Sequence, residues 1–162
     1  MSASVAKRLT TADILAEART WIGTPWHPHG NLRNVGANCA AMHVALAQLM
    51  GIALEALPVE YHQILLAPDW HLHTRREYFR EAFEHGGHVR AVPVAEMQPP
   101  DILLFGFGQN PCSHAGILTT LEPQPTMLHI DFRRQITEEP LGGWRRRLRA
   151  VLRLRYLEDA LC

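Results

Sequence analysis

The sequence WIGTPWHPHGNLRNVGANCAAMHVALAQLMGI, from Trp21 to Ile52, decides the fold. Its Gly23-Thr24-Pro25 is typical of a helix end. Residues 26–37 contain a proline and two glycines and predict a loop. A helix then runs from about Cys39 to Met50, because apolar side chains recur there with helical spacing. Its predicted buried stripe is Met42, Leu46, Leu49 and Met50, and Gly51 is the predicted C-terminal cap.

Cys39 lies where this loop becomes a helix. Free backbone N–H groups and the helix dipole favour a thiolate at such a position, so we expect a lowered thiol pKa and a nucleophile. The backbone N–H of Cys39 is also placed to bind an oxyanion. The chain has three cysteines and no C-x-x-C pair, which does not predict a disulfide framework or a zinc knuckle. Cys112 is expected to be a bystander, and no role is assigned to Cys162.

Helices dominate the first half of the chain around this segment. A first helix is predicted before Gly23, and Thr10 and Asp13 form a capping box at its start. A third helix is predicted over Thr74–His85, with a capping box of Thr74 and Glu77. The side chains expected to pack inward are Ile14, Leu15, Ala18, Trp21 and Ile22 in the first helix, and Tyr78, Phe79, Ala82 and Phe83 in the third.

The second half of the chain predicts strands. Short apolar runs separated by Gly, Pro and Asn lie at Ile102–Phe105, His114–Thr120, Met127–Asp131 and Val151–Tyr156. Helices followed by strands with turn-length connections favour an α+β domain with a small antiparallel β-sheet, and argue against a doubly wound parallel sheet. A length of 162 residues fits one domain, so we expect a single domain over residues 1–162, with the Cys39 helix packed on the sheet.

The composition excludes some classes of function. The 16 basic residues balance the 16 acidic ones, so no net field favours nucleic acid. A local cluster of Arg145, Arg146, Arg147 and Arg149 is interpreted as a solvated face, with binding to an anionic polymer as the alternative. No stretch reaches the roughly 18 apolar residues that span a bilayer, so we expect no membrane span.

Two histidines are candidates for the proton carrier that a cysteine nucleophile needs. His114 opens the apolar strand HAGILTT directly after a polar loop, and His129 lies within the strand signal MLHID. If these strands pair, His129 can stand beside His114 and orient its ring, as the third member of a triad does. The alternative is that both are ordinary half-buried histidines.

Two H-x-H pairs, His27 with His29 and His71 with His73, could chelate a metal. Neither pair has a carboxylate or a cysteine at a typical zinc spacing, so we expect no metal site.

Taken in order, these segments resemble the NlpC-type cell-wall cysteine peptidases (the NlpC and p-sixty family). Residues 21–52 resemble the nucleophile region of that family. The stretch PPDILLFGFGQNPCSHAGIL, residues 99–118, resembles its P-G-D-[VI]-L-L-F followed by H-x-G-I. MLHID and LGGWRRRLRAVLRLRY, residues 127–131 and 141–156, resemble the ending of the branch encoded near phage and prophage tail genes. The resemblance spans about residues 14–157.

The resemblance implies a papain-like fold and a cysteine peptidase. Cys39 resembles the nucleophile, His114 the base, and His129 the polar residue that orients the base. The implied reaction is hydrolysis of an amide bond in a peptidoglycan stem peptide, between γ-D-glutamyl and diaminopimelate, through a thioester. No metal or organic cofactor is implied. The implied partners are the peptidoglycan peptide and phage or prophage tail proteins.

The sequence departs from the family beside the nucleophile. Trp26 stands where many members have a tyrosine whose hydroxyl helps at the oxyanion site, and an indole N–H can still donate one hydrogen bond. Asn38 replaces the aspartate that helps to receive the substrate's amino group, so recognition of a free amine should weaken. Ser113, which precedes His114, is a further residue expected to contact substrate. Ala41 and Pro100 replace glycines of the family pattern.

These departures keep two alternatives open: a related Cys/His amidase or acyltransferase on the same fold, and a tail or assembly component that has lost activity. Met1–Thr11 lacks the apolar run of a signal peptide, so we expect synthesis in the cytoplasm. Action on the cell wall would then need delivery by a phage particle, lysis or an export machinery.

Overall fold

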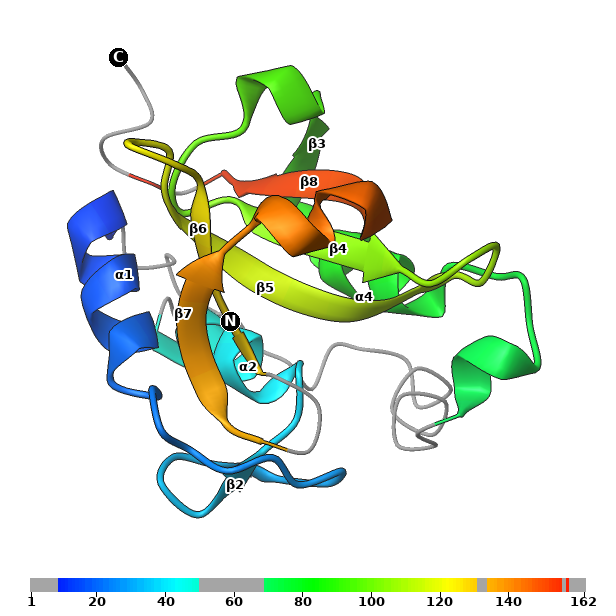
Figure 1. Cartoon of the computed structure of the whole chain (residues 1–162), viewed down its shortest axis with the longest axis horizontal. Coiled ribbons are helices and arrows are strands. Elements are labelled where there is room, and N and C mark those ends of the chain that lie inside the picture. The colour runs from blue at the N-terminus through cyan, green and yellow to red at the C-terminus, as the bar shows by residue number, and fades with distance from the viewer. Residues whose placement is uncertain (1–8, 50–68, 131–133, 156, 158–162) are drawn as a thin grey trace, which may run out of the picture.

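The computed structural model describes residues 9–49, 69–130, 134–155 and 157 (Figure 1). Most helices precede the main strands along the chain. The α-helices are α1 (Thr11–Arg19), α2 (Ala41–Leu49) and α4 (Tyr78–Glu84), and the 3-10 turns are η2 (Trp70–Leu72), η3 (His85–Gly87), η4 (Val94–Glu96) and η5 (Gly142–Arg147). The strands are β1 (Asn31–Leu32), β2 (Gly36–Ala37), β3 (Val89–Val92), β4 (Ile102–Gly106), β5 (Cys112–Thr120), β6 (Thr126–Ile130), β7 (Ile136–Pro140) and β8 (Leu148–Leu154).

Six strands form one sheet in the order β3-β8-β4-β5-β6-β7, and every neighbouring pair is antiparallel. The predicted α+β class with an antiparallel sheet is confirmed. The two edge strands, β3 and β7, were not predicted, because neither VRAV nor ITEEP contains a longer apolar run. The predicted loop over residues 26–37 contains a short hairpin, in which β1 and β2 are strands of two residues each.

The first helix begins as predicted. The Thr10 side chain accepts from the backbone of Asp13 and the Asp13 side chain accepts from the backbone of Thr10, which completes the capping box. Ile14 and Ala18 are fully buried, whereas Ile22 is 44% exposed and lies beyond the helix.

The predicted start of the third helix at Thr74 is wrong, because α4 begins at Tyr78. The Glu77 carboxylate accepts a hydrogen bond from the N–H of Cys112 on β5, at 2.9 Å, and so does not close a capping box with Thr74. A long-range contact therefore replaces the local one.

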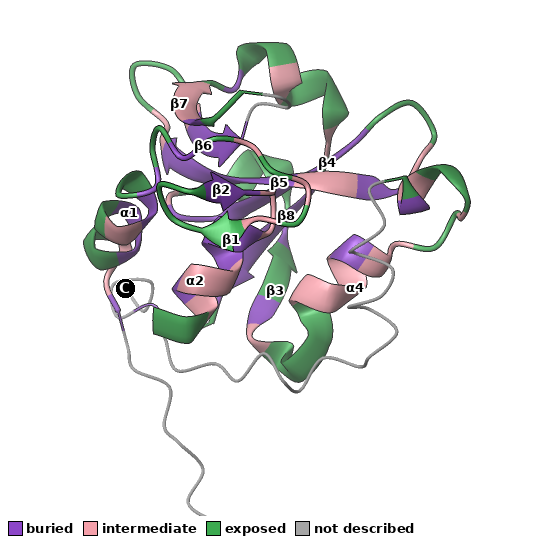
Figure 2. Ribbon diagram, turned by 90° about the horizontal axis from the view of Figure 1, so that it is seen from below, coloured by how far each residue is buried: buried purple, intermediate pink, exposed green. Residues whose placement is uncertain are grey.

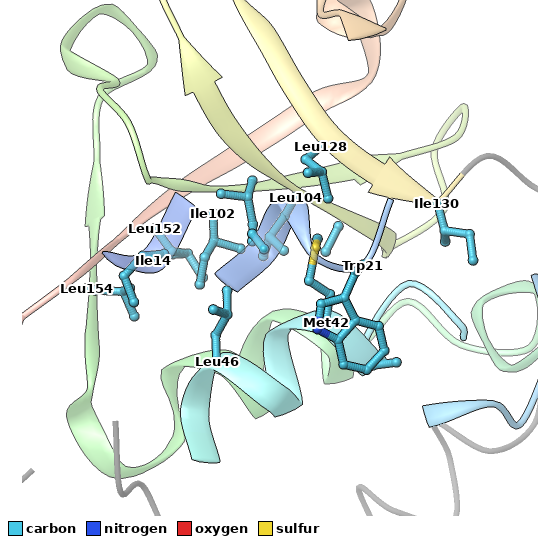
Figure 3. Packing of buried hydrophobic residues seen from close by; sticks show 14 of the residues in the cluster. Ile14, Trp21, Met42, Leu46, Ile102, Leu104, Leu128, Ile130, Leu152 and Leu154 are labelled. Carbon is cyan, nitrogen blue, oxygen red and sulfur yellow. The ribbon is translucent and has the colours of Figure 1, made fainter. Parts of the chain in front are cut away.

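The helices cover one face of the sheet (Figure 2). Met42 and Leu46 of α2 point toward Ile102 and Leu104 of β4, beside Ile14 and Trp21 (Figure 3). Leu49, expected in the α2 stripe, is 38% exposed. The predicted positions Met50, Gly51, Asp131 and Tyr156 lie outside the described residues.

The other face of the sheet carries a second core, packed beneath η5. Residues directly opposite each other on paired strands share a face. Its members are Val92, Met97, Leu103, Phe105, Leu118, Met127, Leu141 and Val151, with Leu121, Trp144 and Leu148 at its margin. His114 lies opposite Phe105, and His129 lies opposite Gly116 two residues further along β5, so both histidines belong to this face. Of the helices in the described part of the chain, none is long and apolar enough to cross a membrane.

Candidate active site

Backbone hydrogen bonds fold the segment before α2 into a tight loop that brings Cys39 to the sheet. The N–H of His27 donates to the carbonyl of Ala37 at 2.8 Å, and the N–H of Asn38 donates to the carbonyl of Gly30 at 3.0 Å. A Cβ at Gly30 would collide with the backbone of Gly36, so this crossing requires glycine. The loop geometry therefore fixes where α2 begins.

Asn38 caps α2. Its Oδ1 accepts hydrogen bonds from the N–H groups of Ala40 and Ala41, both at 3.0 Å, and its Nδ2 donates to the carbonyl of Pro28 at 3.2 Å. The first helical residue is Ala41, so Cys39 lies two residues ahead of the helix. Two of the N–H groups that were expected to favour a thiolate are thus occupied by Asn38. Contact of Asn38 with substrate stays a prediction.

The sulfur of Cys39 lies against the main chain of β5. The thiol donates to the carbonyl of Ser113 at 3.7 Å, and the N–H of Ala115 donates to the sulfur. These two residues flank His114. Burial raises the pKa of Cys39 to about 11, although the N–H groups of Ala115 and Cys39 act in the opposite direction. The pKa thus moves opposite to the shift expected from a helix start.

The predicted pairing of His114 with His129 is present as a hydrogen bond. Nε2 of His114 lies 2.9 Å from Nδ1 of His129. Nε2 of His129 lies 2.8 Å from Oε1 of Glu139, and the same oxygen accepts from the indole N–H of Trp144 at 2.9 Å. Four side chains from β5, β6, β7 and η5 therefore form one connected chain of hydrogen bonds.

The His114 imidazole is held as the neutral form. Burial lowers its pKa to about 3, and the neighbouring His129 and His43 shift it further in the same direction. With the Cys39 pKa raised, the site near pH 7 holds a thiol and a neutral imidazole rather than an ion pair. Such a pair can react if the proton leaves the sulfur as the sulfur attacks.

His43 is a third histidine near the site, and no sequence pattern singles it out. It lies one turn after Cys39 on α2, is buried, and its ring meets Phe83 edge-on at 5.1 Å. Neither ring nitrogen has a hydrogen-bond partner, and burial lowers its pKa to about 4. It therefore stays neutral beside His114.

The remaining predicted site residues take the following places. Trp26 is partly buried against the main core, and its main-chain N–H donates to the carbonyl of Arg134 at 2.8 Å. Ser113 contacts the Cys39 sulfur through its main-chain carbonyl. Cys112 is buried, and burial together with Glu77 raises its pKa to about 12. Cys162 lies outside the described residues.

The H-x-H pairs do not assemble a metal site within the described part of the chain, where no three His, Cys, Asp or Glu side chains group to hold an ion. His73 instead contacts Asp69 at 3.1 Å. Arg145, Arg146, Arg147 and Arg149 are exposed, and the Arg147 guanidinium lies 5.5 Å from the ring of Trp144.

Glu139 and Trp144 are the site residues that sequence reasoning missed. Trp144 was part of the family resemblance without a role, and Glu139 lies in a strand that was not predicted. The contact between Glu139 and His129 depends on the register of β6 and β7, and no local sequence pattern indicates it.

Comparison with solved structures identifies the fold. The chain is similar to the NlpC/p60 domain of the peptidoglycan hydrolase SagA, with a TM-score of 0.60, 16% identity, and coverage of 90% of this chain and 100% of that domain. It is also similar to an NlpC/p60 family protein from Bacillus cereus, with a TM-score of 0.61, 16% identity, and coverage of 94% of this chain and 42% of that one.

A third similar structure is a lipoprotein-like NLP/P60 family protein from Staphylococcus aureus, with a TM-score of 0.59, 15% identity, and coverage of 94% of this chain and 45% of that one. This chain therefore spans less than half the length of the Bacillus and Staphylococcus proteins. The sequence itself matches no protein-family model and no curated protein. The structural neighbours are NlpC/p60 domain proteins, and the fold of this chain is accordingly the papain-like NlpC/p60 fold.

Proposed function

We propose that this protein is a cysteine peptidase that hydrolyses an amide bond in peptidoglycan stem peptides, with Cys39, His114 and His129 as its catalytic residues. One observation carries the proposal. The Cys39 sulfur lies against the main chain on both sides of His114, and the His114 ring is hydrogen-bonded to His129 at 2.9 Å. This supports the proposal because the sulfur contacts residues on both sides of His114, on a fold shared with NlpC/p60 domains.

In the first step the Cys39 thiol exchanges its hydrogen bond with Ser113 for one with Nδ1 of His114. The sulfur attacks the substrate carbonyl carbon as its proton passes to Nδ1. The N–H of Cys39 and the indole N–H of Trp26 stabilise the oxyanion. The C–N bond then breaks, the His114 imidazolium gives its proton to the leaving amine, and a thioester on Cys39 remains.

In the second step water attacks the thioester while His114 accepts a proton from it. The C–S bond then breaks, the carboxylic acid product leaves, and His114 returns the proton to the sulfur, which restores the thiol of Cys39. The ring of His114 must keep one orientation through both steps, and the hydrogen bond to His129 provides this.

The substrate class rests on the fold and on the sequence resemblance. One structural neighbour is a peptidoglycan hydrolase, and the resemblance points to the bond between γ-D-glutamyl and diaminopimelate. Asn38 holds the start of α2 with its amide and carries no charge, so we expect weaker recognition of a free amino group. The protein would reach the cell wall with a phage particle, on lysis or through an export machinery, and phage tail proteins are its proposed partners.

The test is digestion of purified peptidoglycan, followed by identification of the new termini by mass spectrometry. We expect new amino termini of diaminopimelate with the wild type and none with Cys39→Ala. Cys112→Ala is the matched control, because it removes the neighbouring buried cysteine and should retain activity. Cleavage by Cys39→Ala at the wild-type rate would refute the proposal.

Two other outcomes correspond to the alternatives. Release of a different amine or of an acyl group, dependent on Cys39, would identify an amidase or an acyltransferase on this fold. No release of any product by the wild type would favour a tail or assembly component without activity.

A further inference from the structure

A carboxylate ends the histidine chain at the edge of the sheet. β7 pairs with β6 so that Met127 faces Glu139 and His129 faces Thr137, which places Glu139 diagonally beside His129. The His129 side chain is completely buried, whereas that of Glu139 is 39% exposed. Their contact of 2.8 Å therefore links a ring inside the protein to a group at its surface.

The direction of each hydrogen bond between His114, His129 and Glu139 follows from the contact with Trp144. An indole nitrogen can only donate, so Oε1 of Glu139 is an acceptor in its 2.9 Å contact with Trp144. The same oxygen faces Nε2 of His129, so Nε2 of His129 must carry the hydrogen. A neutral His129 then presents the lone pair of Nδ1 to His114.

We infer that Glu139, held by Trp144, fixes the tautomers of His129 and His114 and is a positioning residue for the proposed reaction. With its lone pair on Nδ1, His129 accepts the hydrogen bond from Nε2 of His114 at 2.9 Å. Neutral His114 therefore keeps a free lone pair on Nδ1, the nitrogen proposed to take the proton of Cys39. Only this last link rests on the proposed function, because the tautomers follow from the hydrogen bonds of a neutral histidine pair.

Trp144 has a second effect on the same rings. Its indole stacks on His114 with centroids 5.0 Å apart at 24°, and meets His129 edge-on at 4.8 Å. Phe105 adjoins both rings, 5.5 Å from Trp144 and 5.9 Å from His114. The stack limits rotation of both imidazoles and keeps water from competing for their nitrogens.

Without the acceptor at Glu139, His129 can also exist with its hydrogen on Nδ1. His114 would then have to accept at Nε2 and carry its own hydrogen on Nδ1, which cannot take a proton from Cys39. Loss of the outer partner of a metal-ligating histidine typically costs about 10- to 100-fold in activity, and we expect a similar range for a partner that orients a histidine base. We expect Glu139→Leu to lower kcat by this factor and to change KM by less than about threefold, since Glu139 does not contact substrate.

The experiment combines two readouts on protein labelled with 15N in its histidine rings. NMR of the ring nitrogens reports the tautomers directly, and release of diaminopimelate amine from isolated stem peptide reports kcat and KM. Glu139→Gln keeps an oxygen acceptor and should restore most of the lost activity. Glu138→Leu is the matched control, because Glu138 is the adjacent residue of β7 and pairs with Arg19 instead. Trp144→Phe removes the second donor and should give a smaller loss than Glu139→Leu.

The expected spectrum of the wild type has protonated Nε2 and unprotonated Nδ1 in both His114 and His129, with a mixture of tautomers in Glu139→Leu. A wild-type His114 with a protonated Nδ1 overturns the inference, and this result does not depend on how any variant folds. Unchanged tautomers and unchanged kcat in a folded Glu139→Leu variant overturn it as well. If the wild type shows the expected tautomers but cleaves no stem peptide, the proposed function fails and the tautomer assignment stands.

Discussion

The two sides of the candidate site are built differently. On the helix side, formed by Asn38, Cys39 and α2, main-chain groups and an amide cap leave the sulfur buried against β5. On the sheet side, His114 and His129 are linked to further side chains by directed hydrogen bonds. Burial keeps the thiol protonated and the imidazole neutral. Burial therefore opposes activation of Cys39 by its helix, and the proposed reaction depends on His114 as the base.

Removal of His114, the proposed base, should have the largest effect. General base catalysis contributes typically about 10²- to 10⁴-fold, so we expect His114→Gln to lower kcat for stem-peptide cleavage by that factor. His73→Gln serves as the control, since the His73 side chain is exposed and contacts Asp69, away from the candidate site. A loss below tenfold in His114→Gln would show that the sheet side does not supply the base.

The rate of alkylation of Cys39 measures how little thiolate the helix side of the site holds. The pKa of the thiol is raised from 9.0 to about 11, so the thiolate fraction near pH 8 should be about 100-fold lower than for an ordinary cysteine. Iodoacetamide should modify Cys39 slowly, at a rate that increases with pH up to about pH 11, as peptide mapping can show. Rapid alkylation at pH 6 would instead reveal a thiolate already present at the helix start.

His43 and His114, whose pKa values are lowered, make stability depend on pH in a defined direction. The pKa of His43 falls from 6.5 to about 4 and that of His114 to about 3, so below pH 6.5 the unfolded chain binds protons that the folded chain does not. The free energy of unfolding should therefore fall with decreasing pH, by up to about 1.4 kcal/mol per pH unit for each histidine.

His43→Leu removes one of these two contributions and should flatten the slope between pH 6.5 and about 4, measured by urea unfolding at a series of pH values. His73→Leu, at an exposed position, should leave the slope as it is. An identical slope in His43→Leu and the wild type would show that His43 is not buried in its neutral form.

The smallest expected effect concerns the cap on the helix side. Asn38→Ala should lower the free energy of unfolding by about 1 kcal/mol, because the N–H groups of Ala40 and Ala41 lose their acceptor. Thr10→Ala, which removes the cap of α1, should cost a similar amount. The two variants should differ in thiol chemistry: alkylation of Cys39 should become faster in Asn38→Ala and remain unchanged in Thr10→Ala. Equal alkylation rates in the two variants would show that the Asn38 cap does not contribute to the raised pKa of Cys39.

Sequence alone predicted those parts of the site that depend on local patterns. The loop before Cys39 and the strands carrying His114 and His129 follow from apolar spacing and from glycine and proline, and the structure contains them. Glu139 was not predicted, because the polar sequence ITEEP gives no strand signal and its contact with His129 depends on register. The direction of the Cys39 pKa shift was also missed, because it depends on burial against β5, a tertiary effect.

The most direct measurement is a hydroxylamine partition experiment on isolated stem peptide. If Cys39 forms a thioester, hydroxylamine should intercept it and convert a rising share of the acid product into a hydroxamate, while the amine is released by the wild type and not by Cys39→Ala. Amine release by Cys39→Ala at the wild-type rate, with no hydroxamate at any hydroxylamine concentration, would contradict the account.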